Sequence, residues 1–227
     1  MQSADKRFPE TAKIAEKANE GIHKGHDFCH AKRVAHFSQV IAMAEWQSQR
    51  TAELAGLASL CHNADRILQE TIGKDKTTKE TIEFMVRTWI AKSDANQEET
   101  DAVVTAVLIH SGRNDPSHSM ITLALRDADR VVNMELDLVI RSGQHYYSLP
   151  AVDYVNFLGD PEVTYHNPKS VLRDISFSLE WINPACPFCF QTPTGMKLGL
   201  ERSKALQWFF DKLREQLKKS GLLAHIK

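Results

Sequence analysis

Apolar residues recur every three or four positions along most of this chain, which is the period of a helix with one face in a hydrophobic core. A clear example is the stripe formed by Val34, Phe37 and Ile41 in the segment 26–46. Few runs alternate apolar and polar residues as strands do, and only ten glycines and eight prolines interrupt the 227 residues. The pattern therefore predicts an all-α fold.

The expected helices are bounded by ordinary start and stop signals. Pro9 suits the first turn of the first helix, Gly25 would end that helix, and Thr77 with Glu80 has the spacing of a capping box. The expected helices lie at about 9–24, 26–46, 51–70, 77–89, 97–111, 117–141, 168–182 and 200–219.

Two segments lack helical periodicity. Residues 142–167 are rich in aromatic and polar side chains, and a loop of this length in a compact domain usually serves a function or contains a short element. Residues 183–199 hold three prolines and the pair Cys186 and Cys189. A zinc site on this pair is not expected, because no two further ligands follow at the usual spacing.

One domain is expected over residues 1–227, because no repeat, low-complexity run or charged linker divides the chain. Its helical core would span about 10–182, the segment 183–199 would be irregular, and a closing helix would follow at about 200–219.

The charge balance argues against some classes of partner. The chain has 28 Lys and Arg against 29 Asp and Glu, so its formal net charge is −1. Such a balance is atypical of proteins devoted to nucleic acid or to membrane surfaces. No stretch approaches the roughly 18 apolar residues of a membrane span, and the start MQSADKRFPE lacks the apolar core of a signal peptide. We therefore expect a cytoplasmic protein with four reduced cysteines and no nucleic-acid or membrane partner.

Several polar residues occupy positions where the helical period calls for an apolar one. His30, His110 and Asp129 lie on the inward stripes of three different expected helices, and His62 follows the stripe residue Cys61. A buried carboxylate is costly unless a positive group faces it. A single inward histidine is more often a hydrogen-bonded core residue, but the combination favours a metal site between helices.

Three motifs in order resemble the HD superfamily of bacterial metal-dependent phosphohydrolases. They are GHDFCHAKRVAHFSQVIA from Gly25 to Ala42, LASLCHNADRI from Leu57 to Ile67 and LRDADRVVNMELD from Leu125 to Asp137. The closing helix is also similar to that of small stand-alone members. The resemblance covers roughly residues 10–219, leaving 142–167 and 183–199 without a clear counterpart. It implies an all-α bundle with a metal site between its helices.

The resemblance implies that His30, His62, position 63 and Asp129 are the metal ligands. Position 63 is Asn63, whereas the superfamily has Asp in the doublet that gives it its name. With two neutral imidazoles and one carboxylate, a divalent ion would keep a charge of +1, and an amide oxygen is a weaker ligand than a carboxylate. Asp65, three residues after His62, is expected near the same face and is a candidate substitute.

The chemistry implied by the resemblance is hydrolysis of a small phosphate ester, such as a nucleotide, by a metal-activated water. The ion would be Mn, Fe, Ni, Mg or Zn. His110 is the candidate acid or orienting group, with Asp65 as a second candidate in the catalytic site. Arg33 and Arg130 are the candidates for binding the substrate phosphate, although ordinary ion pairs would explain either arginine.

Two alternatives remain open. Because of Asn63, the chain could be a degenerate member that binds a metal or a nucleotide as a sensor without turnover. The histidines could also serve packing alone in a plain helical bundle. The sequence predicts neither the substrate nor the oligomeric state.

Overall fold

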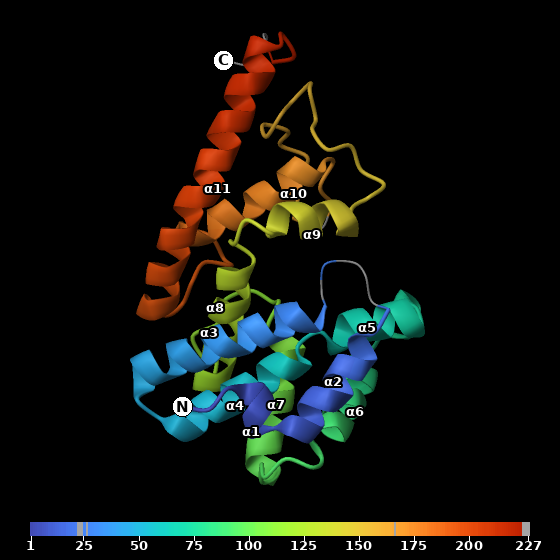
Figure 1. The fold of residues 1–227 in the computed structure, drawn as a ribbon, viewed down its shortest axis with the longest axis vertical. Coiled ribbons are helices and arrows are strands. Elements are labelled where there is room, and N and C mark those ends of the chain that lie inside the picture. The colour runs from blue at the N-terminus through green and yellow to red at the C-terminus, as the bar shows by residue number, and fades with distance from the viewer. Residues whose placement is uncertain (22–24, 26, 166, 224–227) are drawn as a thin grey trace.

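The computed structural model describes residues 1–21, 25, 27–165 and 167–223. Across these ranges the regular structure is helical, and the strand-like pairing is limited to an isolated bridge between Thr164 and Asn167. The all-α prediction is confirmed (Figure 1). Among the described helices, none combines the length and the apolar character that a membrane crossing requires.

The helices follow one another along the chain, and the longest connection between consecutive helices lies between α9 and α10. In chain order they are α1 Ala4–Arg7, α2 Pro9–Asn19, α3 Phe28–Trp46, α4 Gln49–Cys61, α5 Ala64–Thr71, η1 Lys74–Lys76, α6 Lys79–Ile90, α7 Gln97–Ile109, α8 Met120–Val132, α9 Leu138–His145, α10 Val171–Phe177, η2 Ser178–Ile182 and α11 Pro193–Lys219. The labels α and η denote α-helices and 3-10 helices.

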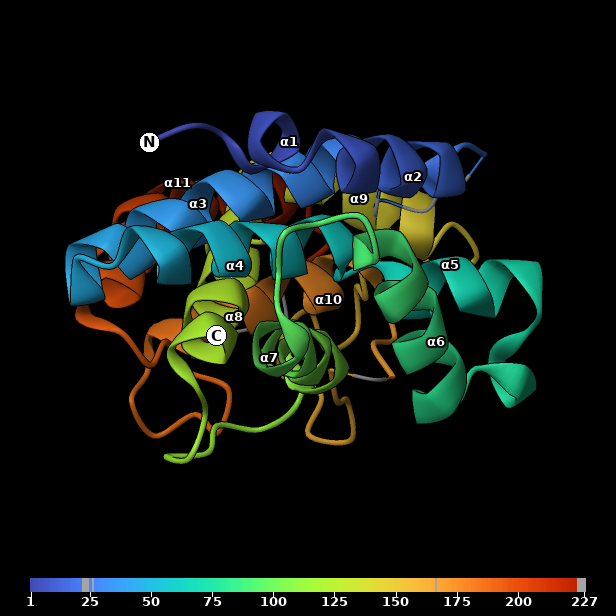
Figure 2. The ribbon, with the colours of Figure 1, turned by 90° about the horizontal axis from the view of Figure 1, so that it is seen from below.

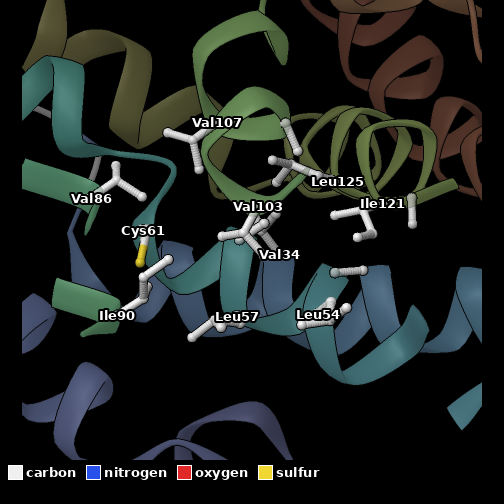
Figure 3. Packing of buried hydrophobic residues seen from close by; sticks show 14 of the residues in the cluster. Val34, Leu54, Leu57, Cys61, Val86, Ile90, Val103, Val107, Ile121 and Leu125 are labelled. Carbon is white, nitrogen blue, oxygen red and sulfur yellow. The ribbon is translucent and has the colours of Figure 1, made fainter. Parts of the chain in front are cut away.

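A helical bundle forms the first part of the molecule. Helices α3 and α4 lie side by side, and α7 and α8 pack against them (Figures 1 and 2). Val34, Leu57, Val103 and Leu125, one from each of these helices, are fully buried members of one hydrophobic cluster, in which Val34 and Val103 lie close together (Figure 3). Burying each such side chain stabilises the fold by about 1.5–3 kcal/mol, which explains the apolar stripes of the sequence.

A second hydrophobic cluster begins at Val131 near the end of α8 and joins α9, α10, η2 and α11. Ile175, Leu206 and Phe210 are among its fully buried members. The long helix α11 runs along one side of this part in Figure 1. Phe37 packs against both clusters, so the bundle and the second cluster share a contact surface.

Two expected helices are each broken in two, and both breaks bear on the site. The helix expected at 51–70 stops at Cys61 and resumes at Ala64, and the one expected at 117–141 stops at Val132. At the first break the His62 ring bonds to the Ser59 carbonyl, a helix-terminal acceptor. At the second break Arg141 donates to the Val132 carbonyl at 3.2 Å. In each case a side chain satisfies a backbone carbonyl that the continuing helix would have used.

The last helix begins earlier than expected, at Pro193, so the irregular segment ends at Thr192. The carboxylate of Asp127 on α8 accepts bonds from the backbone N–H and the hydroxyl of Thr192, both at 2.7 Å. Gly199 lies inside this helix, where a Cβ would lie 2.2 Å from the ring of Phe190. The glycine is therefore needed for close packing inside a helix.

Smaller corrections concern helix ends. The first expected helix ends at Asn19, and residues 22–24 lie outside the described ranges. The capping box lies one residue later than expected, on Thr78 and Thr81 rather than Thr77 and Glu80. Helix α3 begins after its N-cap residue Asp27, whose carboxylate accepts a 2.7 Å bond from the backbone N–H of His30.

Candidate metal centre

His30, His62 and Asp129 converge at one point, each from a different part of the bundle. His30 lies in the first turn of α3, His62 in the turn between α4 and α5, and Asp129 in the last turn of α8. The Nε2 atoms of the two histidines are 3.2 Å apart. Oδ1 of Asp129 lies 3.2 Å from Nε2 of His30 and 3.8 Å from Nε2 of His62. Among the described residues this is the one group of three such side chains with ligand atoms within 4.8 Å of one another.

The spacing of these three atoms fits a single transition-metal ion. Ligand atoms about 2.1 Å from an ion are separated by about 3.0 Å at a right angle and by about 3.4 Å at the tetrahedral angle. Two of the observed separations, at 3.2 Å, fall in this interval, and the third, at 3.8 Å, corresponds to a wider angle. Two imidazole nitrogens and a carboxylate oxygen are also a usual donor set for such ions.

The protonation of His62 suits a ligand. Its Nδ1 lies 2.6 Å from the carbonyl oxygen of Ser59, which can only accept a hydrogen bond. The proton therefore sits on Nδ1, and a neutral ring leaves the lone pair of Nε2 directed at the other two ligand atoms. Burial lowers the pKa of His62 to about 3, more than the charge of Asp129 raises it, so the ring is neutral near pH 7.

Asp129 remains ionised in this setting. Burial alone would raise the pKa of the carboxyl group, but the hydrogen bond from His30 and the interaction with His62 together hold that pKa well below its usual range. The side chain of Asp129 is 23% exposed, whereas His30 is fully buried. The carboxylate is therefore the ligand that reaches the neighbouring cavity.

Asn133, one helical turn after Asp129, orients that carboxylate. Its Nδ2 donates to Oδ1 of Asp129 at 3.0 Å, the same oxygen that faces the two histidines. Its own Oδ1 accepts a 3.1 Å bond from Nη1 of Arg141, which fixes which end of the amide faces Asp129. Side chains four residues apart on a helix lie close together, so the spacing of Asp129 and Asn133 could have indicated this pair from the sequence.

Asn63 and Asp65, the polar residues that follow His62, occupy different environments. Asn63 is buried and begins the turn into α5. Asp65 lies in the first turn of α5, where its carboxylate accepts a 2.7 Å bond from the backbone N–H of Arg66. The helix expected to carry both His62 and Asp65 is interrupted between them, since α4 ends at Cys61 and α5 begins at Ala64. The role of Asp65 as a substitute ligand therefore stays a prediction. Asp65 does not belong to the group of converging ligand atoms.

His110 lies next to the three ligands. Its ring stacks edge-on against His62 with centroids 5.5 Å apart, and its Nδ1 lies 2.6 Å from the carbonyl oxygen of Val107. The arrangement repeats that of His62, since both rings cap the end of a helix by donating to the carbonyl three residues earlier. In the neutral ring Nε2 is left to accept a proton or a hydrogen bond.

The two arginines singled out in the sequence have different surroundings. Arg33 forms ion pairs with Glu135 at 2.7 Å and Asp137 at 2.6 Å. It does not line the cavity that Asp129 reaches, nor a second cavity beside that one. Arg130 is buried and pairs with Asp127 at 3.2 Å, so it is an ion pair but not a solvated one. It lines the cavity that Asp129 reaches.

The two cavities differ in their lining residues. The metal-side cavity, about 340 Å³, is lined by Asp129, His110 and several aromatic side chains. The basic cavity, about 460 Å³, is lined by Arg66, Lys74 and Arg141 among others. Their shared lining residues are Arg66, Tyr165 and Trp181.

Sequence reasoning missed Arg66 and Tyr165 as parts of the site. Tyr165 belongs to the aromatic segment 142–167, whose length had indicated a function without indicating a residue. Burial raises the pKa of the Tyr165 hydroxyl, and the charge of Asp129 raises it further, which places this hydroxyl within electrostatic range of the ligand. Arg66 offered no signal, because an arginine beside an aspartate is usually an ordinary surface ion pair.

Comparisons with known proteins agree with this architecture. No family model and no curated protein matches the chain. It is similar to a crystal structure of a protein from Lactobacillus plantarum, with a TM-score of 0.66, 13% identity and coverage of 96% of this chain and 100% of that one. It is also similar to an HD-superfamily hydrolase from Bacillus thuringiensis, with a TM-score of 0.62, 14% identity and coverage of 95% and 98%. The chain thus has the fold of an HD-superfamily hydrolase, as the motifs had implied.

Proposed function

We propose that this protein hydrolyses a small phosphorylated molecule with the help of one divalent metal ion held by His30, His62 and Asp129. The observation that carries the proposal is the convergence of two imidazole nitrogens and one carboxylate oxygen with separations of 3.2, 3.2 and 3.8 Å. The HD-hydrolase fold adds support, since it brings these residues together from three separate segments.

A bound divalent ion would supply a water of lowered pKa and would polarise a phosphoryl oxygen. The residues of the chain perform the remaining tasks. Ser59 and Asn133 orient His62 and Asp129 through their hydrogen bonds. His110 lines the metal-side cavity, and its Nε2 would hold or deliver a proton there. Arg130, at the wall of that cavity, adds positive charge toward a phosphate.

The donor set favours a transition metal over Mg²⁺, because imidazole nitrogen suits Mn²⁺, Fe²⁺, Ni²⁺ or Zn²⁺ better. Asn63 stands where the superfamily motif has a carboxylate, so the ion and its ligands would carry a charge of +1. That charge would acidify the bound water and make the resulting hydroxide a weaker nucleophile. Slow turnover is therefore expected of the natural chain.

The second candidate function is binding without turnover, and Asn63 is the observation that favours it. The side chain at this position is buried next to His62 and contributes no negative charge. A protein of this kind would bind the metal and the phosphorylated ligand and act as a sensor.

Metal analysis of protein purified without an affinity tag, together with phosphate release from a panel of esters, tests both candidates. Asn63→Asp should tighten the metal and raise phosphate release if the natural site is weak but competent. If Asp65 supplies the missing carboxylate, Asn63→Asp should change little and Asp65→Asn should abolish metal binding. Metal binding without turnover in all three proteins would favour the sensor. Turnover that survives simultaneous loss of His30, His62 and Asp129 would overturn both candidates.

A further inference from the structure

The basic cavity has a composition that the chemistry at the metal does not explain. Arg66, Lys74, Arg141 and His145 line it, against one carboxylate, that of Asp174. A concave site with an excess of positive charge concentrates anions. The metal-side cavity also has arginines in its lining, but two of them, Arg126 and Arg130, are buried, and two carboxylates, those of Asp129 and Glu180, lie beside them.

Not all of this charge is available to a ligand. Arg141 is buried and committed to the fold, since it donates to Asp137 at 3.1 Å and to the Asn133 side chain and the Gly25 carbonyl. Arg66 is held far more loosely: its Nε lies 3.8 Å from Asp65, its side chain is 40% exposed, and Gln69 accepts a bond from it at 3.4 Å. Lys74, in the short helix η1, is also exposed. These two side chains can turn toward an anion without breaking a buried contact.

The carboxylate in the cavity is partly masked. Asp174 accepts a 2.6 Å bond from the hydroxyl of Ser142, and burial raises the pKa of its carboxyl group. Its repulsion of an anion is therefore smaller than that of a solvated aspartate. Hydroxyl groups of Tyr146, Tyr165 and Ser178 complete the lining with further donors.

The basic cavity adjoins the proposed reaction site. Arg66, Tyr165 and Trp181 line both cavities, and Asn133, which lines the basic one, touches Asp129. A ligand that occupies both cavities would thus pass Tyr165 and Arg66. Its reacting phosphate would lie near Asp129 and another polar group near Lys74.

We propose that the basic cavity is a second phosphate-binding subsite formed by Arg66 and Lys74, and that the substrate carries a second phosphoryl group. The subsite itself is independent of turnover. The second phosphoryl group of the substrate, in contrast, rests on the proposed hydrolase function.

Phosphate binding to the full chain after removal of metal with EDTA tests the subsite alone. The probe is inorganic phosphate, measured by calorimetry at low ionic strength. Arg66→Gln and Lys74→Gln should each weaken phosphate binding about tenfold, the effect of one charge-assisted hydrogen bond of about 1.4 kcal/mol. Lys76→Gln is the matched control, since Lys76 is another lysine of η1 that does not line the cavity, and it should bind like the natural chain.

A gain of binding provides a test that misfolding cannot imitate. Asp174→Asn removes the negative charge from the cavity and keeps the shape of the side chain, so it should tighten phosphate binding several-fold above the pKa of Asp174. Unchanged affinity in Arg66→Gln, Lys74→Gln and Asp174→Asn would overturn the subsite. Equal weakening in Lys76→Gln would also overturn it, because the effect would then be that of net charge alone.

Metal-loaded protein tests whether the substrate carries a second phosphoryl group. The ratio of kcat/KM for a sugar bisphosphate to that for the matching monophosphate should exceed one. Lys74→Gln should reduce this ratio about tenfold, whereas the control Lys76→Gln should leave it unchanged. A ratio of one in the natural chain would overturn the proposal that the substrate carries a second phosphoryl group. If neither ester is hydrolysed while phosphate binding depends on Arg66 and Lys74, the proposed function fails and the subsite stands.

Discussion

The bundle that ends at Val132 and the segments that follow it contribute different parts of the site. The three proposed ligands come from α3, from the turn before α5 and from α8, all within the bundle. The cavity walls depend on the later segments, which supply Tyr165 and Trp181 to both cavities. Metal geometry is thus set by rigidly packed helices, and the shape offered to a ligand is set by a long irregular segment. Substitutions in the two parts should therefore have separable effects.

The largest expected effect is loss of the metal from the bundle. Asp129→Ala removes the one charged ligand of the cluster, so we expect metal affinity to fall by more than about 100-fold, which is the upper range for loss of a residue that only supports a ligand. The rise in melting temperature in excess Mn²⁺ should disappear with it, since that rise reflects binding to the native state. Calorimetric titration and thermal unfolding with and without Mn²⁺ measure both effects.

Tyr165→Phe is the matched substitution in the later segment. It should leave metal affinity and the Mn²⁺ effect on melting unchanged, and should raise KM for a phosphate ester. If Tyr165→Phe loses metal as Asp129→Ala does, the division of roles between the two parts is wrong.

The ligands of the bundle could be predicted because they violate a strong pattern. His30 and Asp129 stand on apolar stripes of long helices, and the cost of burying polar groups there indicates a special role from the sequence alone. The break at His62 and Asn63 could not be predicted, since it depends on the His62 ring bonding to the Ser59 carbonyl. Periodicity alone continues across such a break, because residues on either side still face the same core.

The later segments could be predicted less well because their structure depends on distant residues. The early start of α11 requires Asp127, which lies 65 positions before Thr192. The place of Tyr165 depends on how the long segment between α9 and α10 packs, which no local pattern determines. Arg66 became part of the site only because two cavities meet at it, and nothing in its neighbourhood in the sequence indicates this.

After the loss of metal, the next largest expected effect is on stability, and it compares the two hydrophobic clusters. Leu57 in the bundle and Leu206 in the later part are both fully buried. Leu57→Ala and Leu206→Ala should each lower the free energy of unfolding by about 2–5 kcal/mol. Because Phe37 packs against both clusters, we expect one cooperative transition in each variant, measured by urea unfolding with two spectroscopic probes. Two separate transitions in Leu206→Ala would show that the later part unfolds independently.

Asn133→Ala should have a smaller effect on metal affinity, and it also removes the bond that Arg141 donates to Asn133 Oδ1. It removes the 3.0 Å bond to Asp129 Oδ1 and leaves every proposed ligand in place. Loss of such a supporting bond reduces metal affinity by about 10–100-fold. Asn114 provides a control, since its side chain bonds Arg126 and Arg130 but no ligand. Asn114→Ala should reduce stability without the same loss of metal affinity, and the reverse order of effects would contradict the role given to Asn133.

The smallest expected effect is a pH dependence of stability that belongs to the later part. Burial raises the pKa of Asp174 on α10 above the value of 3.8 that an unperturbed aspartate has. Between these two values the folded protein retains a proton that the unfolded chain has released, so stability falls as pH rises through this window. Asp174→Asn cannot titrate, and its free energy of unfolding relative to the natural chain should therefore increase across the window and level off above it. Ser142→Ala should widen the window, because the bond from the Ser142 hydroxyl lowers the pKa of Asp174. Urea unfolding at a series of pH values measures these differences, and parallel profiles for the natural chain and Asp174→Asn would contradict the raised pKa. Because Asp174 lies outside the bundle, the two proteins should differ in this profile and still bind Mn²⁺ equally at each pH.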